Sequence, residues 1–181
     1  MKSMLCVALV MSAVVGLLVG CATAPSTRAE QEALVADAES RMQQMRASDP
    51  ALGDLVRRNY GYAMFPEVTK GGLVVGGAYG RGVVYEQGKH VGYSDLAQAS
   101  VGLQVGGQTF SELLVFENKS AMDRFKAGGL DFSADASAVI LESGVATNAT
   151  FVDGVAVVVN PIGGVMVEAS IGGQKFSYQR R

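Results

Sequence analysis

Cysteine and histidine are scarce in this 181-residue chain, which has two cysteines, one histidine and no tryptophan. Cys6 and Cys21 lie in the first 21 residues, so the rest of the chain has no thiol for a disulfide or a thiolate nucleophile. A Ser-His-Asp triad or a histidine-rich zinc site would have to be built around His90, which we expect on the surface beside a turn. We therefore predict no enzyme activity, no metal and no cofactor.

An excess of positive charge is also missing. The chain has 15 Lys and Arg against 17 Asp and Glu, a formal net charge of −2. A nearly balanced, slightly acidic chain gives no electrostatic footprint for nucleic acid, so we expect no nucleic-acid partner. Acidic pairs such as Asp131 and Asp135 leave general acid–base catalysis as a minor alternative, although nothing in their spacing singles them out.

Long apolar runs are missing except at the N-terminus. Lys2 supplies a positive charge, and an uncharged apolar run at residues 5–19 follows it. This run is shorter than the roughly 20 residues of a spanning helix and is typical of a signal peptide. The alternatives are an ordinary secretory signal and an uncleaved anchor.

The letters LVGC at positions 18–21 resemble the lipobox of bacterial lipoproteins. The resemblance implies that Cys21 is the first mature residue and carries a diacylglycerol and an N-acyl chain, a stable lipid anchor. Ala22 follows where an aspartate usually retains lipoproteins in the inner membrane. We therefore expect a protein anchored to the outer membrane, with its domain facing the periplasm.

These features divide the chain into a signal peptide at residues 1–20, a lipidated linker at 21–27 and one domain at 28–181. Removing 20 of the 181 residues leaves 161, which suits one domain. Of the charged residues only Lys2 is lost, so 14 Lys and Arg face 17 Asp and Glu, a net charge of −3.

The domain begins with signals for two helices. Thr27 and Glu30 have the spacing of a capping box. The apolar residues that follow at helical spacing are Leu34, Ala38, Met42 and Met45. Asp49 and Pro50 predict the start of a second short helix, whose buried side is Leu52, Leu55 and Val56. A third short helix is expected near residues 120–127, capped by Ser120 and stopped by glycines 128 and 129.

From Tyr60 onward, short apolar runs alternate with glycine and polar pairs, which favours strands. Residues 86–89 predict a hairpin turn, and the run ELLVFE at 112–117 predicts a strand buried on both faces. Residues 160–163 predict a second hairpin turn, between GVAVVVN and GVMVEAS. The expected fold class is α+β, with the N-terminal helices packed on a strongly curved, mainly antiparallel sheet.

The glycine-rich stretch VTKGGLVVGGAYGRGVVY at 68–85 raises the question of a phosphate site. Gly72 and Gly77 have P-loop spacing, but Ala-Tyr follows instead of Lys-Ser/Thr. Gly80 and Gly82 lead into Val-Val-Tyr, which favours a strand and not the helix of a dinucleotide fingerprint. Two interpretations remain: the glycines serve sheet geometry alone, or some of them also admit a ligand.

Three blocks of sequence resemble the SYLF domain in the form found in bacterial lipoproteins. They are NYGYAMFPEVTKGGLVVGGAYGRGVVY, VGLQVGGQTFSELLVF and GVMVEASIGGQKFSY, and the resemblance runs from about Ala51 to Tyr178. The family is described as lipid-binding. The resemblance implies that this domain binds an anionic lipid or an acyl chain without catalysis.

The cations placed to meet an anionic headgroup lie beside the glycine-rich stretch and after the second helix. Lys70, Arg81 and Lys89 belong to the first group, and Arg57 and Arg58 end the helix. Each is also explained as a solvated surface charge, or by the helix dipole for the last two. The alternative function is a structural envelope protein that binds a protein or peptidoglycan partner through a sheet edge.

Overall fold

The structure is a computed structural model, and the residues that it describes are 25, 27–72, 75–101, 106–130, 132, 139–140, 146, 149–163 and 172–181. Four expectations lie outside these residues. They concern the signal peptide, the lipid attachment at Cys21, the acidic pair Asp131 and Asp135, and the strand expected at GVMVEAS.

The described residues form three helices and seven strands, so the predicted α+β class is confirmed. The helices are α2 (Arg28–Ser48), α3 (Ala51–Arg58) and α4 (Lys119–Lys126). The strands are β1 (Gly61–Gly72), β2 (Val75–Glu86), β3 (Lys89–Val101), β4 (Gly106–Phe116), β5 (Val139–Ile140), β6 (Val155–Gly163) and β7 (Gln174–Arg180).

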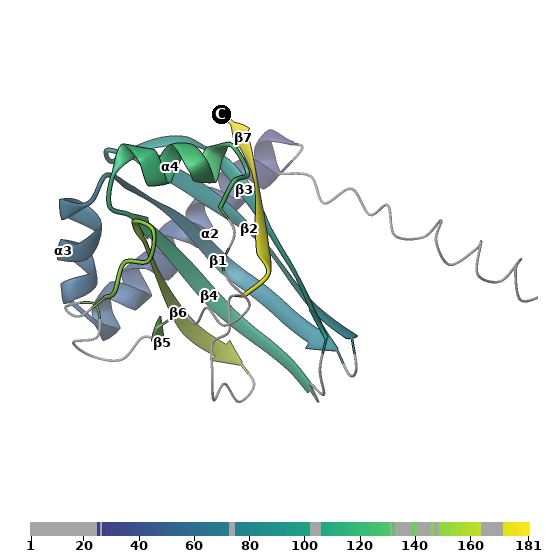
Figure 1. Cartoon of the computed structure of the whole chain (residues 1–181). Coiled ribbons are helices and arrows are strands. Elements are labelled where there is room, and N and C mark those ends of the chain that lie inside the picture. Colours follow the sequence, from purple (N-terminus) through teal and green to yellow (C-terminus); the bar gives the residue numbers. More distant parts are fainter. Residues whose placement is uncertain are drawn as a thin grey trace, which may run out of the picture.

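All strands belong to one sheet with the order β5-β6-β4-β1-β2-β3-β7 (Figure 1). Neighbouring strands are antiparallel except for β5, which runs parallel to β6. Among the described residues the edge strands β5 and β7 do not pair with each other, so the sheet is not closed. The turn between β2 and β3 has positive φ at Gln87 and Gly88, as a two-residue type I′ hairpin requires, and confirms the predicted turn.

One face of the sheet, the back face, carries α2 and α3 (Figure 1). The capping box of α2 is present, because Glu30 N donates to Thr27 Oγ1 at 3.2 Å and Thr27 N donates to Glu30 Oε2 at 3.3 Å. Ala38, Met42 and Met45 are buried, as their helical spacing predicts. The sheet residues that pack with them in one cluster are Met64, Val83, Tyr93, Leu113, Val115 and Val158.

The opposite face, the front face, carries α4 and a second cluster rich in phenylalanine. The cluster includes Phe65, Phe110, Leu114 and Phe116 of the sheet, Met122 and Phe125 of α4, and Phe176 of β7. Leu113 to Phe116 are all fully buried, because β4 lies between the two clusters. The predicted burial of this run on both faces is therefore confirmed.

Gly80 and Gly82 of β2 explain much of the glycine-rich stretch. A Cβ on Gly82 would lie 2.7 Å from Phe65 Cδ1 and 2.9 Å from the carbonyl oxygen of Met64. A Cβ on Gly80 would lie 2.7 Å from Val68 Cγ2. The register between β1 and β2 shifts next to these positions, between Met64 and Glu67. The two glycines thus make room for a bulge in β1 and for the ring of Phe65, which favours the architectural interpretation at these positions.

Two local predictions were wrong. Residues 160–163 are not a hairpin turn, because β6 continues through them and pairs with β4, with Asn160 opposite Ser111 and Pro161 opposite Phe110. The N-cap of α4 is Asn118 and not Ser120, because the side chain of Asn118 accepts from Ala121 N at 3.0 Å. Asparagine and serine are both common N-cap residues, so the sequence alone did not show which of the two begins the helix.

Candidate functional site

The structure separates the cations that the sequence grouped around the glycine-rich stretch. Lys70 is half-buried and, by strand alternation from Val68, lies on the front face. Arg81 is exposed on the back face, in register with Glu67 of β1 and Asp95 of β3. Lys70 and Arg81 therefore cannot contact one headgroup together.

Lys89 lies at the other end of the sheet from Lys70. Lys70 is opposite Ala78 and Lys89 is opposite Glu86, so eight residues of β2, roughly 26 Å at the rise of a strand, separate their positions. Arg57 and Arg58 are exposed in the last turn of α3, and Arg57 forms an ion pair with Asp54. The predicted cations do not converge on one site.

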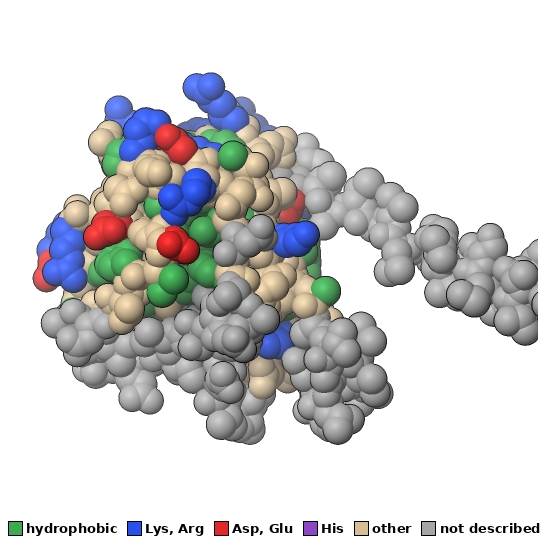
Figure 2. Space-filling model, in the orientation of Figure 1, with side chains coloured by type: hydrophobic (Ala, Val, Ile, Leu, Met, Phe, Trp, Pro, Cys, Tyr) green, Lys and Arg blue, Asp and Glu red, His purple; other side chains and the backbone are tan. Residues whose placement is uncertain are grey.

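Other cations converge at the end of the sheet where α4 and the C-terminal residues lie. There, an open pocket of about 540 Å³ is lined by Glu86, His90, Val91, Lys126, Tyr178, Arg180 and Arg181, and we call it the basic pocket. Three cationic side chains face one carboxylate in this lining. Lys and Arg side chains also gather on the surface at this end of the molecule (Figure 2).

Strand pairing brings the cations together. β7 pairs with β3, so that Arg180 lies opposite Gly92. The hydroxyl of Tyr178 donates to Val91 O at 2.9 Å, and Arg181 N donates to the same oxygen at 3.1 Å. The last residues of β7 are therefore held beside the start of β3, and α4 supplies Lys126 from above.

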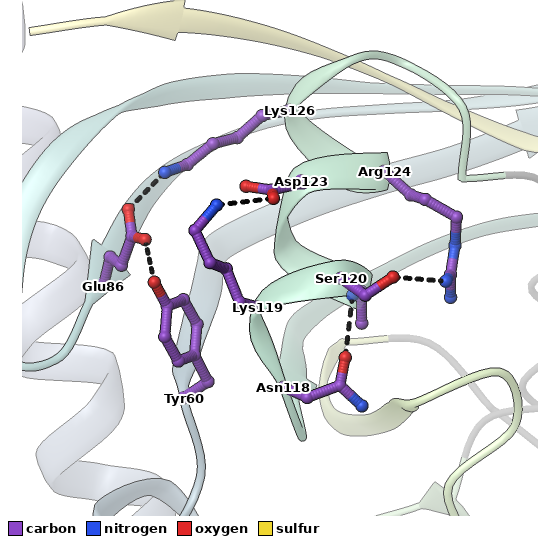
Figure 3. Close-up of polar contacts among 9 residues, drawn as sticks. Tyr60, Glu86, Asn118, Lys119, Ser120, Asp123, Arg124 and Lys126 are labelled. Carbon is purple, nitrogen blue, oxygen red and sulfur yellow. Dashed lines mark hydrogen bonds and ion pairs between the residues drawn. The ribbon is translucent and has the colours of Figure 1, made fainter.

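Glu86 is the carboxylate of the basic pocket, and two groups hold it in place. Tyr60 Oη donates to Glu86 Oε1 at 2.6 Å, and Lys126 Nζ donates to Glu86 Oε2 (Figure 3). The hydrogen bonds from Lys126 and Tyr60 lower the pKa of Glu86, so it is ionised at neutral pH. Lys126 Nζ also lies 5.6 Å from the centre of the Tyr178 ring, within cation–π range.

Arg180 and Arg181 remain without a carboxylate partner among the residues that the structure describes. Both are exposed, so their donors are available to an incoming anion. A guanidinium group presents several N–H donors in a planar fork that matches the oxygens of a phosphate or carboxylate. This end of the molecule therefore has the donors of an anion site.

His90 follows the hairpin turn at the surface, as predicted, but it is half-buried there by neighbouring rings. Its ring lies 5.6 Å from the Tyr85 ring and 4.9 Å from the Tyr93 ring, and Nε2 is 3.2 Å from Gly92 O. Burial lowers the pKa of His90 and the charge of Arg181 lowers it further, so the ring is neutral at pH 7. With a neutral ring, Nε2 carries the proton and donates to Gly92.

The front face holds a second polar group, deep in the apolar cluster. Glu112 and Gln174 are both fully buried, and Gln174 Nε2 donates to Glu112 Oε2 at 2.9 Å. Within the described part of the chain, Oε1 of each residue lacks a hydrogen-bond partner. Burial raises the pKa of Glu112 to about 7, against the opposing effects of the Gln174 hydrogen bond and the charge of Lys70.

The sequence interpretation missed the lysine and arginines of the basic pocket. Lys126 was assigned to the third helix, and Arg180 and Arg181 follow Tyr178 at the end of the chain. The two arginines are 54 and 55 residues away from Lys126, and nothing in the sequence indicates that they lie near it. The pairing of β7 with β3 could not be derived from local pattern. The one indication of a cationic site in the sequence was the arginine pair at 180 and 181, which follows an alternating strand pattern.

Among the described residues, no group of three or more His, Cys, Asp or Glu is placed to hold a metal ion. No helix in the described ranges is both long enough and apolar enough to cross a membrane.

Comparison with known proteins identified one distant relative. No family model matches the chain. The chain is 26% identical over 129 residues to a protein named Beta cell expansion factor A from Aeromonas veronii, a match that covers 70% of this chain and 49% of the relative. The matched segment spans about half the length of that protein.

Proposed function

We propose that this protein binds lipid without catalysis, and that its basic pocket receives the phosphate of an anionic phospholipid. The observation that carries the proposal is the convergence of Lys126, Arg180 and Arg181 on one pocket, with two guanidinium groups left unpaired among the described residues. The pocket wall is partly apolar, because Val91 and the Tyr178 ring contribute to it. Cations next to apolar surface suit a headgroup with its attached glycerol and acyl chains.

We further propose that the protein belongs to the SYLF-domain family and acts at the periplasmic side of the outer membrane. In this proposal, the acyl chains on Cys21 hold it there. The resemblance of the three sequence blocks supports the family, and the LVGC motif supports the anchor. Three acyl chains, at about 0.8 kcal/mol per buried methylene, would keep the domain close to its ligand.

The strong curvature expected for the sheet is part of the same proposal. Gln174 of β7 contacts Glu112 of β4, although three strands separate β7 from β4 in the sheet. Four steps of about 4.8 Å would separate these strands by roughly 19 Å in a flat sheet. β7 also crosses in front of the sheet in Figure 1, and its Phe176 contacts Phe65 of β1 at 5.8 Å between ring centres. We infer that the sheet curls around the front cluster.

Native mass spectrometry of the full chain, extracted from membranes in a mild non-ionic detergent, tests the proposed function. We expect retained phospholipid in addition to the mass of the acylated protein. A spectrum without lipid, together with no recovery of the protein on phosphatidylglycerol, cardiolipin or neutral vesicles, would reject it.

The alternative, a structural envelope protein, has one observation in its favour. β7 is an edge strand that pairs with β3 alone among the described strands, so its other edge offers backbone groups to a partner strand. Co-purification of a stoichiometric protein or peptidoglycan fragment, with no lipid retained, would favour this function over lipid binding.

A further inference from the structure

A second pocket adjoins the basic pocket and has a different chemistry. It is open, has a volume of about 700 Å³ and lies between α2 and the back face of β2 and β3; we call it the aromatic pocket. Its lining consists of Arg28, Gln31, Glu32, Val35, Ala36, Glu39, Tyr85, His90, Tyr93 and Arg181. His90 and Arg181 line both pockets, so the two pockets meet at these residues.

Aromatic rings form one wall of the aromatic pocket. Tyr85 is stacked on Tyr62 at 4.7 Å between ring centres, and His90 stands between Tyr85 and Tyr93. Tyr85 Oη is buried and lacks a hydrogen-bond partner among the described residues, an arrangement that costs free energy unless a ligand or water satisfies it. The Tyr85 ring lies between Tyr62 and His90, and Tyr93 is only 4% exposed, so these rings line the pocket without offering an open ring face.

The charges of the aromatic pocket balance, but they are not all paired. Arg28 Nε and Glu32 Oε1 form an ion pair at 2.8 Å and neutralise each other. Glu39 has no ion pair within the described ranges, and neither has Arg181. Glu39 lies close enough to Tyr62, Tyr85 and His90 to affect their titration. One unpaired carboxylate beside the rings and one unpaired guanidinium therefore line the same pocket.

We propose that the aromatic pocket binds the ammonium group of a zwitterionic headgroup, an amino alcohol esterified to phosphate, while Arg181 at the junction with the basic pocket binds the phosphate. Glu39 provides the counter-charge for the ammonium group, and Tyr85, His90 and Tyr93 form the wall behind it. The inference rests on the proposed lipid binding and names a headgroup class for it, a phosphate that carries an ammonium group, in place of a purely anionic headgroup. The same chemistry is presented by an aminophospholipid and by free phosphoethanolamine.

Binding of soluble headgroups to the full chain in a maltoside detergent tests the pocket itself. Isothermal titration calorimetry would compare phosphoethanolamine with glycerol 3-phosphate, which has the phosphate and no ammonium group. We expect phosphoethanolamine to bind about tenfold more tightly, as one added charge-assisted contact with Glu39 predicts. The variant Glu39→Gln removes this counter-charge and should reduce the preference to about one.

Glu32→Gln is the matched control, because Glu32 lines the same pocket but is already paired with Arg28. It should retain the preference for phosphoethanolamine. Equal binding of the two compounds to the wild type, or a preference that survives Glu39→Gln, would overturn the proposal.

Vesicle flotation distinguishes the source of the headgroup and separates this inference from the proposed function. Recovery on mixed phosphatidylethanolamine and phosphatidylglycerol vesicles above that on phosphatidylglycerol alone would identify a lipid. A preference for soluble phosphoethanolamine with no recovery on any vesicle would support the pocket and reject lipid binding. Recovery on vesicles without any dependence on the ammonium group would support lipid binding and reject the zwitterion.

Discussion

At the scale of single residues, burial shifts the pKa of Glu112 far from its usual value. Its carboxyl group is fully buried among phenylalanine and valine side chains, with a neutral amide as its hydrogen-bond partner. Desolvation disfavours the charged form, which is why the pKa rises to about 7 from the usual value of 4.5.

This burial predicts a stability that depends on pH. Because the folded chain holds the Glu112 proton more tightly than the unfolded chain, its contribution is fully present below pH 4.5 and is lost as the pH rises through 7. The loss amounts to about 3 kcal/mol at most. Urea unfolding at pH 5 and pH 8 would show that Glu112→Gln is stabilised relative to the wild type at pH 8.

The exposed Glu67→Gln variant is the control for Glu112, and it should follow the wild type at both pH values. The same pH dependence in Glu112→Gln as in the wild type would show that the carboxyl group is not the source.

Gly82 provides a second prediction at the residue scale. Gly82→Ala places a methyl group against Phe65 and the carbonyl of Met64, and overpacking of this kind costs about 1–3 kcal/mol. Gly71→Ala is the matched control in β1, since a Cβ there would meet nothing within 4 Å. Free energies of unfolding in urea would separate the two, and equal values would contradict a packing role for Gly82.

At the scale of elements, Asp49 joins three segments. Its side chain is buried, with Oδ1 accepting from Ala51 N at 3.0 Å and Oδ2 accepting from Ala146 N at 2.7 Å. Its own backbone N–H donates to Met45 O and ends α2. One residue therefore terminates α2, supports the start of α3 and holds the segment at Ala146.

Loss of this side chain should loosen the back face. Asp49→Ala leaves the buried N–H of Ala146 and the partly buried N–H of Ala51 unpaired, and the buried group alone costs about 1–3 kcal/mol. Asp49→Asn keeps one acceptor oxygen and should cost less. Unfolding in urea, with hydrogen exchange of the α3 amides, would measure both effects. The exposed variant Asp37→Ala is the control, and its free energy of unfolding should stay within about 0.5 kcal/mol of the wild type. An equally small change in Asp49→Ala would show that Asp49 does not hold the three segments together.

Elements governed by local signals could be predicted from the sequence. The capping box at Thr27, the hairpin turn at Gln87 and Gly88, and the buried run of β4 each depend on neighbours in the chain, and each is present. The strand partners could not all be predicted from the sequence. Strands that are consecutive in the chain usually pair, but β6 pairs with β4 and β7 pairs with β3. β6 extends instead through Pro161, which the pattern favoured as a turn.

The residues of the candidate site could not be predicted from local sequence either, because strand pairing decides which of them lie together. Lys70 and Arg81 flank one glycine-rich stretch, but strand alternation places them on opposite faces of the sheet. Lys126 and Arg181 are distant in sequence, and they meet because β7 returns to β3 beneath α4. Charge and proximity in the chain led us to predict an anionic ligand, but they did not predict which cations converge.

At the scale of the whole molecule, the distribution of charge is more informative than its sum. The chain carries a net charge of −2, which by itself repels an anionic membrane. The basic pocket concentrates three cations against one carboxylate at one end of the sheet. Binding to anionic vesicles should therefore require this end to face the membrane, and added salt should weaken it.

Flotation of residues 22–181, which omit the proposed lipid anchor, on phosphatidylglycerol vesicles tests the central claim most directly. The double variant Arg180→Gln, Arg181→Gln should lose at least about 1.4 kcal/mol of binding free energy, a tenfold fall in affinity. The double variant Arg57→Gln, Arg58→Gln removes the same charge from the end of α3 and should bind like the wild type. Equal losses for the two variants, or none for either, would contradict the account.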